Sequence, residues 1–339
     1  MTTTSAPPGS PSAPEPVPSG GDPAQALARL AGTADRLAAA VDRVIQGKDE
    51  TVRLAITVLF AEGHLLVEDV PGVGKTMLAK ALARAVDGSV RRVQFTPDLL
   101  PSDVTGSSVW NQERGDFEFR PGAVFANVVI GDEINRASPK TQSALLECME
   151  EGQVTVDGTT WPLERPFIVF ATQNPVEMDG TYPLPEAQRD RFTARISMGY
   201  PSAEAELLML SEHGAVEPLA GLRPVVDVDE VRELIRAVRS VHAAQALQQY
   251  VVDLVRSTRE HPDLRLGASP RAALHLLRTA RSRAALDGRD HVLPDDVQAL
   301  AVPVVAHRLV LTADAQLSGR TGEDVVVDVL RRTPLPVPR

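Results

Sequence analysis

The sequence predicts an α/β core built on a mostly parallel sheet, followed by a smaller helical domain. Short apolar runs alternate with helical patterns from about residue 24 to 200, as expected for strands joined by crossover helices. One run leads into a Gly-rich segment that opens a helical pattern. After Tyr200 and Pro201 the strand patterns stop and helical patterns continue. These observations divide the ordered chain into residues 24–200, the core, and residues 201–339, a helical domain with a C-terminal tail.

The composition limits the class of protein. A chain of 339 residues with 43% hydrophobic residues can fold into two or three domains without crosslinks. A formal net charge of -10 argues against a surface shaped as a whole for nucleic acid. One cysteine excludes an intramolecular disulfide and a multi-cysteine metal site. Without an apolar run of 18 residues or a signal-peptide pattern, we expect no membrane insertion and a cytoplasmic location.

The N-terminal part predicts a tail and two helices. Residues 1–23 are rich in Pro, Ser and Thr and poor in large apolar side chains, so we expect a disordered tail. Apolar residues recur near helical spacing over residues 24–44. A second helical pattern runs from the end of a turn at residues 45–48 to Phe60, and the apolar run Leu65 to Val67 predicts the first buried strand.

The segment from Asp69 to Thr76 predicts a phosphate-binding loop. Its backbone N–H groups would face nucleotide phosphates, the Lys75 ammonium would reach the outer phosphates, and the Thr76 hydroxyl would bind Mg²⁺. We therefore expect ATP or GTP binding. Asp69 stands where the general pattern has Gly. Asp tolerates left-handed backbone better than most residues, so the turn could survive, whereas a carboxylate near phosphates could weaken binding; the sequence leaves the effect on affinity open. The expected nucleotide-binding residues of this segment are Pro71, Gly72, Val73, Gly74, Lys75, Thr76 and Met77.

An acidic pair follows the loop. A short strand at residues 90–95 and a section rich in turn residues precede the apolar run Val128 to Ile130. The run ends in Asp132 and Glu133, and a buried parallel strand delivers its last residues to the ligand edge of the sheet. We expect Asp132 to hold Mg²⁺ through water and Glu133 to orient and deprotonate the attacking water. Two such carboxylates alone are a weak signal, and the upstream loop is what favours this interpretation.

A polar strand end completes the series. A hairpin is predicted around Asp157 and Gly158, followed by a strand at residues 167–171. The chain then passes to Asn174, whose amide would lie beside the γ-phosphate and the same water. An Asn-Pro pair alone is only a turn signal, so its position in the series carries the prediction. Later helical patterns cover residues 203–210, 228–238, 244–257, 270–285 and 294–309.

At this point the chain resembles the MoxR family of AAA+ ATPases. The matching stretches extend over nearly all of residues 24–309, which implies an AAA+ P-loop NTPase core followed by an all-α lid domain. Residues 69–76 would then form the Walker A motif, and Asp132 and Glu133 the end of Walker B. The stretches that carry the resemblance are Leu100–Gly106, Phe119–Phe125, Asp132–Leu146, Ala171–Pro175, Leu184–Gln188 and Gly267–Arg271.

The resemblance also implies roles for single residues. Asn174 would be the sensor-1 residue, and Arg271, which opens a lid helix, the sensor-2 residue that touches the γ-phosphate. Arg191 looks like the arginine finger, which stabilises transition-state charge in a neighbouring subunit's site. The family more often has Leu where Arg189 stands, so the sequence leaves open which of the two arginines makes the contact.

Four further residues have two interpretations each. By resemblance, Gln46 and Gly47 would contact adenine, and the alternative is an ordinary turn between helices. Trp110 and Trp161 lie in the two insertions that such ATPases often use to touch partners. Packing of each tryptophan against its own hairpin is the favoured interpretation.

The function implied by the resemblance is Mg²⁺-dependent ATP hydrolysis by a ring, expected to be a hexamer, that remodels a protein client in a chaperone-like way. A von Willebrand factor A-type protein is the implied partner. The alternatives are a nucleic-acid motor, a motor subunit like that of magnesium chelatase, and a regulatory protein that binds nucleotide without turnover. A nucleic-acid motor would concentrate Lys and Arg in the insertions, where acidic and neutral residues predominate, so we expect no nucleic-acid partner.

Overall fold

The five core strands form one parallel sheet. A mostly parallel sheet was predicted, but its fifth strand, at residues 194–196, was not. The computed structural model describes residues 23–70, 72–174, 181–200, 203, 207 and 219–336. The strand order is β2-β5-β8-β1-β9, and every neighbouring pair is parallel. The strands are β1 (Leu65–Glu68), β2 (Val90–Gln94), β5 (Val128–Asp132), β8 (Ile168–Gln173) and β9 (Ala194–Ile196).

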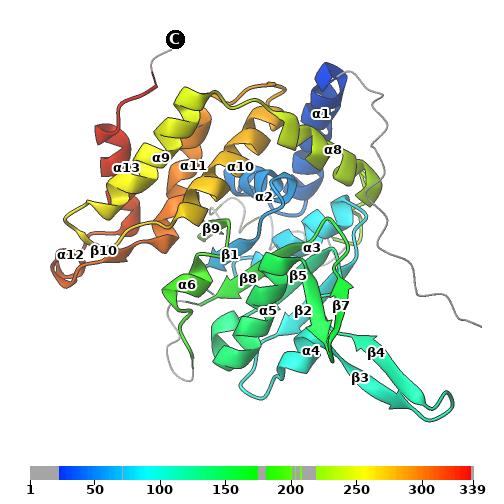
Figure 1. Ribbon diagram of the computed structural model, residues 1–339. Coiled ribbons are helices and arrows are strands. Elements are labelled where there is room, and N and C mark those ends of the chain that lie inside the picture. The colour runs from blue at the N-terminus through cyan, green and yellow to red at the C-terminus, as the bar shows by residue number, and fades with distance from the viewer. Residues whose placement is uncertain are drawn as a thin grey trace, which may run out of the picture.

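Helices cover both faces of this sheet (Figure 1). Successive residues of a strand point to opposite faces, so Leu65 and Val67 join one apolar cluster and Leu66 joins the other. The first cluster includes residues of α1, α2 and α3, and the second includes residues of α4 and α5. Burial on both faces explains why the strands read as continuous apolar runs. These helices are α1 (Pro23–Asp42), α2 (Asp49–Phe60), α3 (Lys75–Ala85), α4 (Pro101–Thr105) and α5 (Pro139–Glu151).

Two hairpins interrupt the core. The hairpin of β6 (Gln153–Val156) and β7 (Thr159–Pro162) confirms the predicted turn, in which Asp157 and Gly158 have φ of 50° and 79°. The hairpin of β3 (Gly106–Asn111) and β4 (Asp116–Pro121) projects from the core in Figure 1. The sequence predicted an insertion with a hairpin around Trp110, but not the limits of its strands.

The aromatic residues of the hairpins pack against one another. Trp110 packs edge-on against Phe117 of its own hairpin, with ring centroids 5.2 Å apart. Trp161 stacks on Phe119 of the other hairpin at 4.6 Å. The packing interpretation therefore holds for Trp110, whereas Trp161 joins the two hairpins to each other.

The second part of the chain is helical, as predicted, with one short strand pair that the sequence pattern did not reveal. The predicted boundary near residue 200 adjoins residues outside the described part, and most of the predicted helix at residues 203–210 and all of the tail except Pro23 also lie outside it. The elements are α8 (Val228–Ser240), α9 (Gln245–Arg259), β10 (Leu264–Leu266), α10 (Pro270–Leu286), α11 (Pro294–Val305), η2 (Ala306–Arg308), β11 (Val310–Leu311), α12 (Ala313–Leu317) and α13 (Gly322–Arg332).

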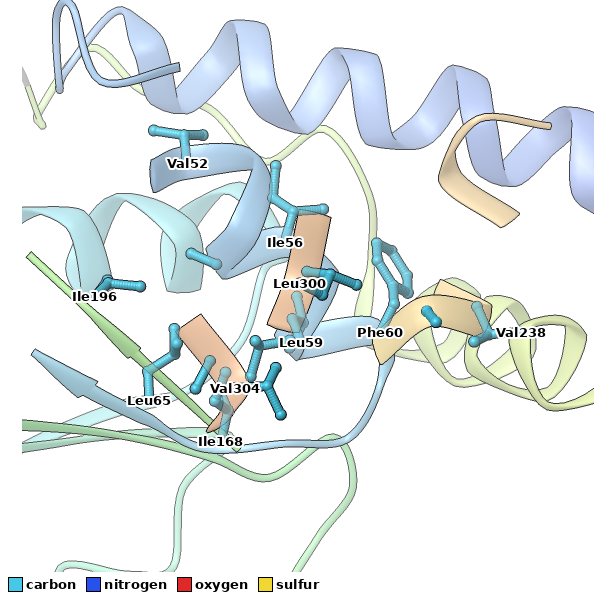
Figure 2. Packing of buried hydrophobic residues seen from close by; sticks show 14 of the residues in the cluster. Val52, Ile56, Leu59, Phe60, Leu65, Ile168, Ile196, Val238, Leu300 and Val304 are labelled. Carbon is cyan, nitrogen blue, oxygen red and sulfur yellow. The ribbon is translucent and has the colours of Figure 1, made fainter. Parts of the chain in front are cut away.

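The lid shares an apolar cluster with the core. Figure 2 shows Leu59 of α2 and Leu65 of β1 close to Val304 of α11, and all three side chains are buried. The buried hydroxyl of Ser282 in α10 also donates to the carbonyl of Thr57 in α2 at 2.7 Å. Apolar burial of this kind contributes about 25 cal/mol per Å². In the part of the chain that the structure describes, no helix combines the length and apolar character needed to cross a membrane.

Candidate functional site

The phosphate loop connects the end of β1 to the start of α3. Gly72 and Gly74 have φ of 85° and 91°, a backbone region that residues with a Cβ rarely adopt, so these positions favour glycine. Gly74 is the residue before α3, and Lys75 and Thr76 begin its first turn. The N–H groups of a first helical turn have no partner within the helix and favour an anion. Pro71, predicted to bind nucleotide, lies outside the described residues.

The side chain of Lys75 reaches back across the phosphate loop to its first residue, Asp69. Its Nζ donates to the carbonyl oxygen of Asp69 at 2.6 Å. Burial lowers the pKa of Lys75, and the carboxylates of Asp69, Asp132 and Glu133 act against that shift. The ammonium is thus partly withdrawn from water at the start of α3, where desolvation strengthens its interaction with an anionic ligand.

The carboxylate of Asp69 has partners of its own. Its Oδ2 accepts hydrogen bonds from the Ser197 hydroxyl at 2.9 Å and from the backbone N–H groups of Met198 and Gly199, both at 2.6 Å. Burial acts to raise the pKa of Asp69, but these hydrogen bonds outweigh it and hold the pKa below its ordinary value. The carboxylate binds the chain that leaves β9, which gives the departure from the Gly pattern a structural role.

Asp132 lies directly beside the loop. Its side chain is 8% exposed and accepts hydrogen bonds from the hydroxyls of Thr76 at 3.3 Å and Thr172 at 3.2 Å. Arg92 of β2 donates to Asp132 Oδ2 at 2.6 Å. A buried carboxylate needs partners of this kind. The sequence pattern did not reveal Arg92 or Thr172, because one looks like an exposed strand charge and the other like a strand-end hydroxyl.

Glu133 has an unusual backbone conformation. Its φ is 57°, in the left-handed region, which costs about 1–3 kcal/mol in a residue other than glycine. The Thr172 hydroxyl accepts its N–H at 3.0 Å. The carboxylate accepts from Gln94 Nε2 at 2.8 Å and pairs with Arg136 at 3.0 Å. The backbone and the side chain of Glu133 are therefore both fixed at this edge of the sheet.

Asn174 follows β8, which lies between β1 and β5. The residues at the ends of the three strands are in register, since Gln173 pairs with Glu68, and Gly131 pairs with Ala171. The buried Asn174 therefore lies at the same edge, between the phosphate loop and the acidic pair. The structure brings together the residues for which the sequence predicted a nucleotide and its metal: Lys75, Thr76, Asp132, Glu133 and Asn174.

The turn at Gln46 and Gly47 is exposed and follows α1, and Gly47 has a φ of 68°. The preceding residue, Ile45, is buried beside the loop: a side chain added at Gly74 would meet its Cδ1 at 3.8 Å. The predicted adenine-contacting turn thus lies next to the phosphate loop.

The donors at this edge fit a magnesium ion. Among the described residues, no group of three or more His, Cys, Asp or Glu side chains could hold a metal alone. The Asp132 carboxylate and the Thr76 hydroxyl nevertheless lie 3.3 Å apart. Mg²⁺ characteristically binds to one or two protein oxygens together with water and substrate phosphates. Asp132 and Thr76 are the residues that would hold it.

Arg191 and Arg271 form a second cluster. Arg191 Nε pairs with Glu150 at 3.2 Å, and Arg271 pairs with the other oxygen of the same carboxylate. Arg271 also lies 3.9 Å from Asp190. Arg191, Arg271 and Glu150 line a cavity of about 210 Å³. Arg189 does not line it, and its buried Nε has no hydrogen-bond partner.

This arginine cluster lies at the sheet edge opposite the phosphate loop. His64, which lines the same cavity, immediately precedes β1, and its Nε2 donates to the Met149 carbonyl at 3.0 Å. The loop begins after β1 ends. The four residues of β1 separate His64 from Asp69, and the five residue steps between them span about 16 Å at the usual rise of a strand. The structure does not bring Arg191 or Arg271 to the phosphate loop of the same subunit.

Comparison with known sequences assigns both parts of the chain. The ATPase family associated with various cellular activities (AAA) matches residues 64–194, and the AAA lid domain matches residues 256–329. The first range contains the strands β1, β2, β5 and β8 of the parallel sheet, and the second contains α10 and α11. The nucleotide-binding edge thus lies within the matched ATPase domain.

Several relatives match most of the chain. The uncharacterized protein YeaC of Bacillus subtilis is 50% identical over 86% of this chain and 92% of its own length. Chaperone MoxR1 of Mycobacterium tuberculosis is 43% identical over 86% of this chain and 79% of its own. Protein MoxR of Paracoccus denitrificans is 35% identical over 79% and 86%, respectively.

The fold also matches a solved structure. The crystal structure of a candidate ATPase from Cytophaga hutchinsonii superimposes with a TM-score of 0.85 and 37% identity, covering 91% of this chain and 97% of that one. The relatives named MoxR, the matched AAA domain and this structure agree on one assignment. The chain belongs to the MoxR family of AAA+ ATPases.

Proposed function

We propose that this ATPase hydrolyses ATP with Mg²⁺ as a ring of identical subunits, and that motion between core and lid remodels a protein client. The observation that carries the proposal is the position of Asp132 and Asn174 at the ends of the adjacent strands β5 and β8, beside the loop that follows β1 and leads to Lys75 at the start of α3. In this account the loop holds the phosphates through its N–H groups and Lys75. Val73 and Met77 form the loop's apolar side, since both pack against the buried cluster.

The same edge supports hydrolysis as well as binding. Thr76 and Asp132 would hold Mg²⁺, which when bound offsets the negative charge of the phosphate oxygens. Glu133 would orient the attacking water and accept its proton, and Asn174 would fix the same water beside the γ-phosphate. Gln94 supports this role, since it holds the Glu133 carboxylate at 2.8 Å.

The position of the arginines supports a ring. Arg191 and Arg271 lie at the edge opposite the phosphate loop, so a site that uses them would combine the loop of one subunit with the arginines of a neighbour. Arg191 is favoured over Arg189 as the finger because it lines the cavity with Arg271. In other nucleotide hydrolases, an arginine supplied by a neighbour raises the hydrolysis rate by a factor on the order of 10³–10⁵. A hexamer is the expected ring size.

The client is proposed from resemblance. A relative that covers most of this chain is named a chaperone, which supports a protein client. A von Willebrand factor A-type partner and a cytoplasmic location are proposed from the family resemblance and the sequence alone. The charges of the hairpins favour a protein over a nucleic acid. The β3–β4 hairpin carries Glu113, Asp116 and Glu118 against Arg114 and Arg120.

Two substitutions test the proposal by separating ATP binding from ATP cleavage. Lys75→Ala should abolish ATP binding, whereas Glu133→Gln should bind ATP and release no phosphate. Glu147→Gln, on the exposed side of α5, serves as the control and should behave like the unsubstituted protein. Equal loss of ATP binding in Lys75→Ala and Glu133→Gln would contradict the role of Glu133.

A further inference from the structure

Arg308, at the end of η2 in the lid, is a buried arginine with every nitrogen of its guanidinium engaged. Its side chain is 1% exposed. Nε donates to the Val304 carbonyl at 2.8 Å, within the lid. One terminal nitrogen, Nη2, donates to His275 Nδ1 at 2.8 Å, also within the lid. The remaining hydrogen bonds cross to the core.

The bonds that cross reach the chain on both sides of Arg191. Nη1 of Arg308 donates to the carbonyl oxygen of Asp190 at 3.0 Å and to its carboxylate at 2.7 Å. Nη2 donates to the carbonyl of Phe192 and lies 3.4 Å from that of Thr193. One lid side chain thus holds the residue before Arg191 and the two residues after it.

Other lid groups converge on the same segment. The Ser269 hydroxyl, at the start of α10, donates to both oxygens of the Asp190 carboxylate at 2.9 and 2.8 Å. His307 Nε2 lies 3.2 Å from the Phe192 carbonyl. Burial lowers the pKa of Arg308 to about 10, so the guanidinium remains charged opposite Asp190 at neutral pH. Residues 190–193 belong to the core in sequence, but the lid supplies these contacts.

We infer that Arg308 is a positioning residue that fixes the segment carrying Arg191 to the lid, so that the arginine and the lid move as one unit. This inference rests on the proposed function of Arg191 as a finger. Replacing a buried ion pair with apolar side chains is often neutral or stabilising. The Arg308–Asp190 ion pair is therefore not explained by a contribution to the stability of the fold. The planar guanidinium can donate to several acceptors of residues 190–193 at the same time, which fixes the position of this segment relative to the lid. Lid motion in one subunit would then move Arg191 relative to the neighbour's nucleotide.

The first test uses Arg308→Lys, which keeps the charge and removes the fork of donors. Arg289→Lys is the matched control, because Arg289 makes a two-pronged contact with Asp296 inside the lid, at 2.7 Å for both bonds. We expect Arg308→Lys to bind ATP with an unchanged Kd and to hydrolyse it roughly 10- to 100-fold more slowly, as for a misplaced catalytic group. The control should stay within about twofold of the parent rate, because lysine keeps the charge and the hydrogen-bond partners of Arg289 all lie within the lid, away from residues 190–193.

Mixed rings show whether Arg308 acts through Arg191. Arg308→Lys subunits mixed with Glu133→Gln subunits should recover hydrolysis, because one supplies the intact site and the other the intact finger. Arg308→Lys mixed with Arg191→Ala should not recover, because both lack a placed finger. Recovery in this second mixture, or loss of ATP binding by Arg308→Lys, would overturn the inference.

Amide hydrogen exchange tests positioning without relying on the ring. Exchange over residues 189–193 should rise in Arg308→Lys and stay unchanged in Arg289→Lys, and an unchanged segment in both would overturn the inference. If mixed rings of Arg191→Ala and Glu133→Gln subunits do not recover ATP hydrolysis, the proposed ring geometry is wrong. The amide hydrogen exchange of residues 189–193 then decides alone whether Arg308 positions this segment. If Arg308→Lys does not fold, Asp190→Asn takes its place with the same expected outcomes.

Discussion

The Asp69 carboxylate oxygen Oδ2 lies 2.6 Å from the backbone nitrogen of Gly199. The first residue of the phosphate loop is thereby bonded to the chain that leaves β9. The N-terminal end of β9 lies three residues after Arg191, at the opposite edge of the sheet. A strand of three residues therefore connects the nucleotide-binding edge to the arginine cluster, and both of its ends are held by charged side chains.

Replacing Asp69 with Asn should destabilise the protein. The amide keeps one acceptor oxygen but loses the charge that receives three strong hydrogen bonds, a loss of about 1.5–3 kcal/mol. The thermal unfolding midpoint should fall by roughly 3–6 °C. Asp116→Asn, at an exposed position of the β3–β4 hairpin, is the control and should leave the midpoint unchanged. Equal midpoints for both variants would refute the structural role of Asp69.

The effect of Asp69 should depend on pH in a defined direction. The pKa of Asp69 in the fold lies below its ordinary value, so its contribution to stability is complete above the pKa of the unfolded residue, about 4. It declines as the pH falls through the lowered pKa of the folded state. The difference in midpoint between the unsubstituted protein and Asp69→Asn should be constant from pH 7 to 5 and shrink below pH 4. A constant difference down to pH 3 would rule this out.

Removing the Thr76 hydroxyl should uncouple ATP binding from magnesium. Thr76→Val keeps the shape of the side chain but takes away one of the two oxygens that would hold the ion. We expect Mg²⁺ to strengthen ATP binding to the unsubstituted protein and to Thr76→Ser, and to have little effect on Thr76→Val. Calorimetric titrations with Mg²⁺ and with a chelator measure this. An equal response to Mg²⁺ in the Ser and Val variants would contradict the assigned role.

The two candidate fingers should differ in their effect on turnover. Arg191→Ala should lower the hydrolysis rate by about 10³-fold or more without loss of ATP binding. Arg189→Ala, whose side chain does not line the cavity with Arg271, should keep a rate within about tenfold of the parent protein. Phosphate release and ATP titration measure the two effects. The opposite ranking of the two variants would assign the finger to Arg189.

Glu150 holds both arginines, so its replacement should favour assembly. In the proposed ring, Arg191 and Arg271 would have to leave this carboxylate to reach a neighbour, and each partly exposed ion pair is worth about 0.2–1 kcal/mol. Glu150→Gln should therefore reach half-maximal activity at a protein concentration lower by roughly 2- to 30-fold. Glu151→Gln, at the adjacent exposed position, should leave that concentration unchanged. A higher concentration requirement for Glu150→Gln would mean that the carboxylate supports assembly.

Much of the fold follows from local patterns. The buried strands β1, β5 and β8 appear as apolar runs because both of their faces are covered, and α9 and α10 begin and end within two residues of their predicted limits. The strand β9 was missed because three residues are too few to show a period. The strand limits of the β3–β4 hairpin were not predicted because its residues are mostly polar, and packing of Trp110 against Phe117 supports the hairpin instead.

Some residues of the candidate site could also be predicted from the sequence, and others could not. Lys75, Asp132 and Asn174 were predicted to lie together because parallel strands deliver their last residues to one edge. Arg308 could not be recognised, since a charged residue near the end of a helix usually lies in solvent and only the tertiary fold buries it. The pairing of Glu150 could not be predicted either, because its two arginine partners come from distant parts of the chain.

The most direct test of the account is steady-state phosphate release from ATP with Mg²⁺ over a range of protein concentrations, beside Glu133→Gln. We predict a specific activity that climbs with concentration as subunits assemble and that vanishes in the variant while ATP binding remains. Turnover per subunit that is the same at all concentrations, or that persists in Glu133→Gln, would contradict a ring whose sites combine the phosphate loop of one subunit with the arginines of the next.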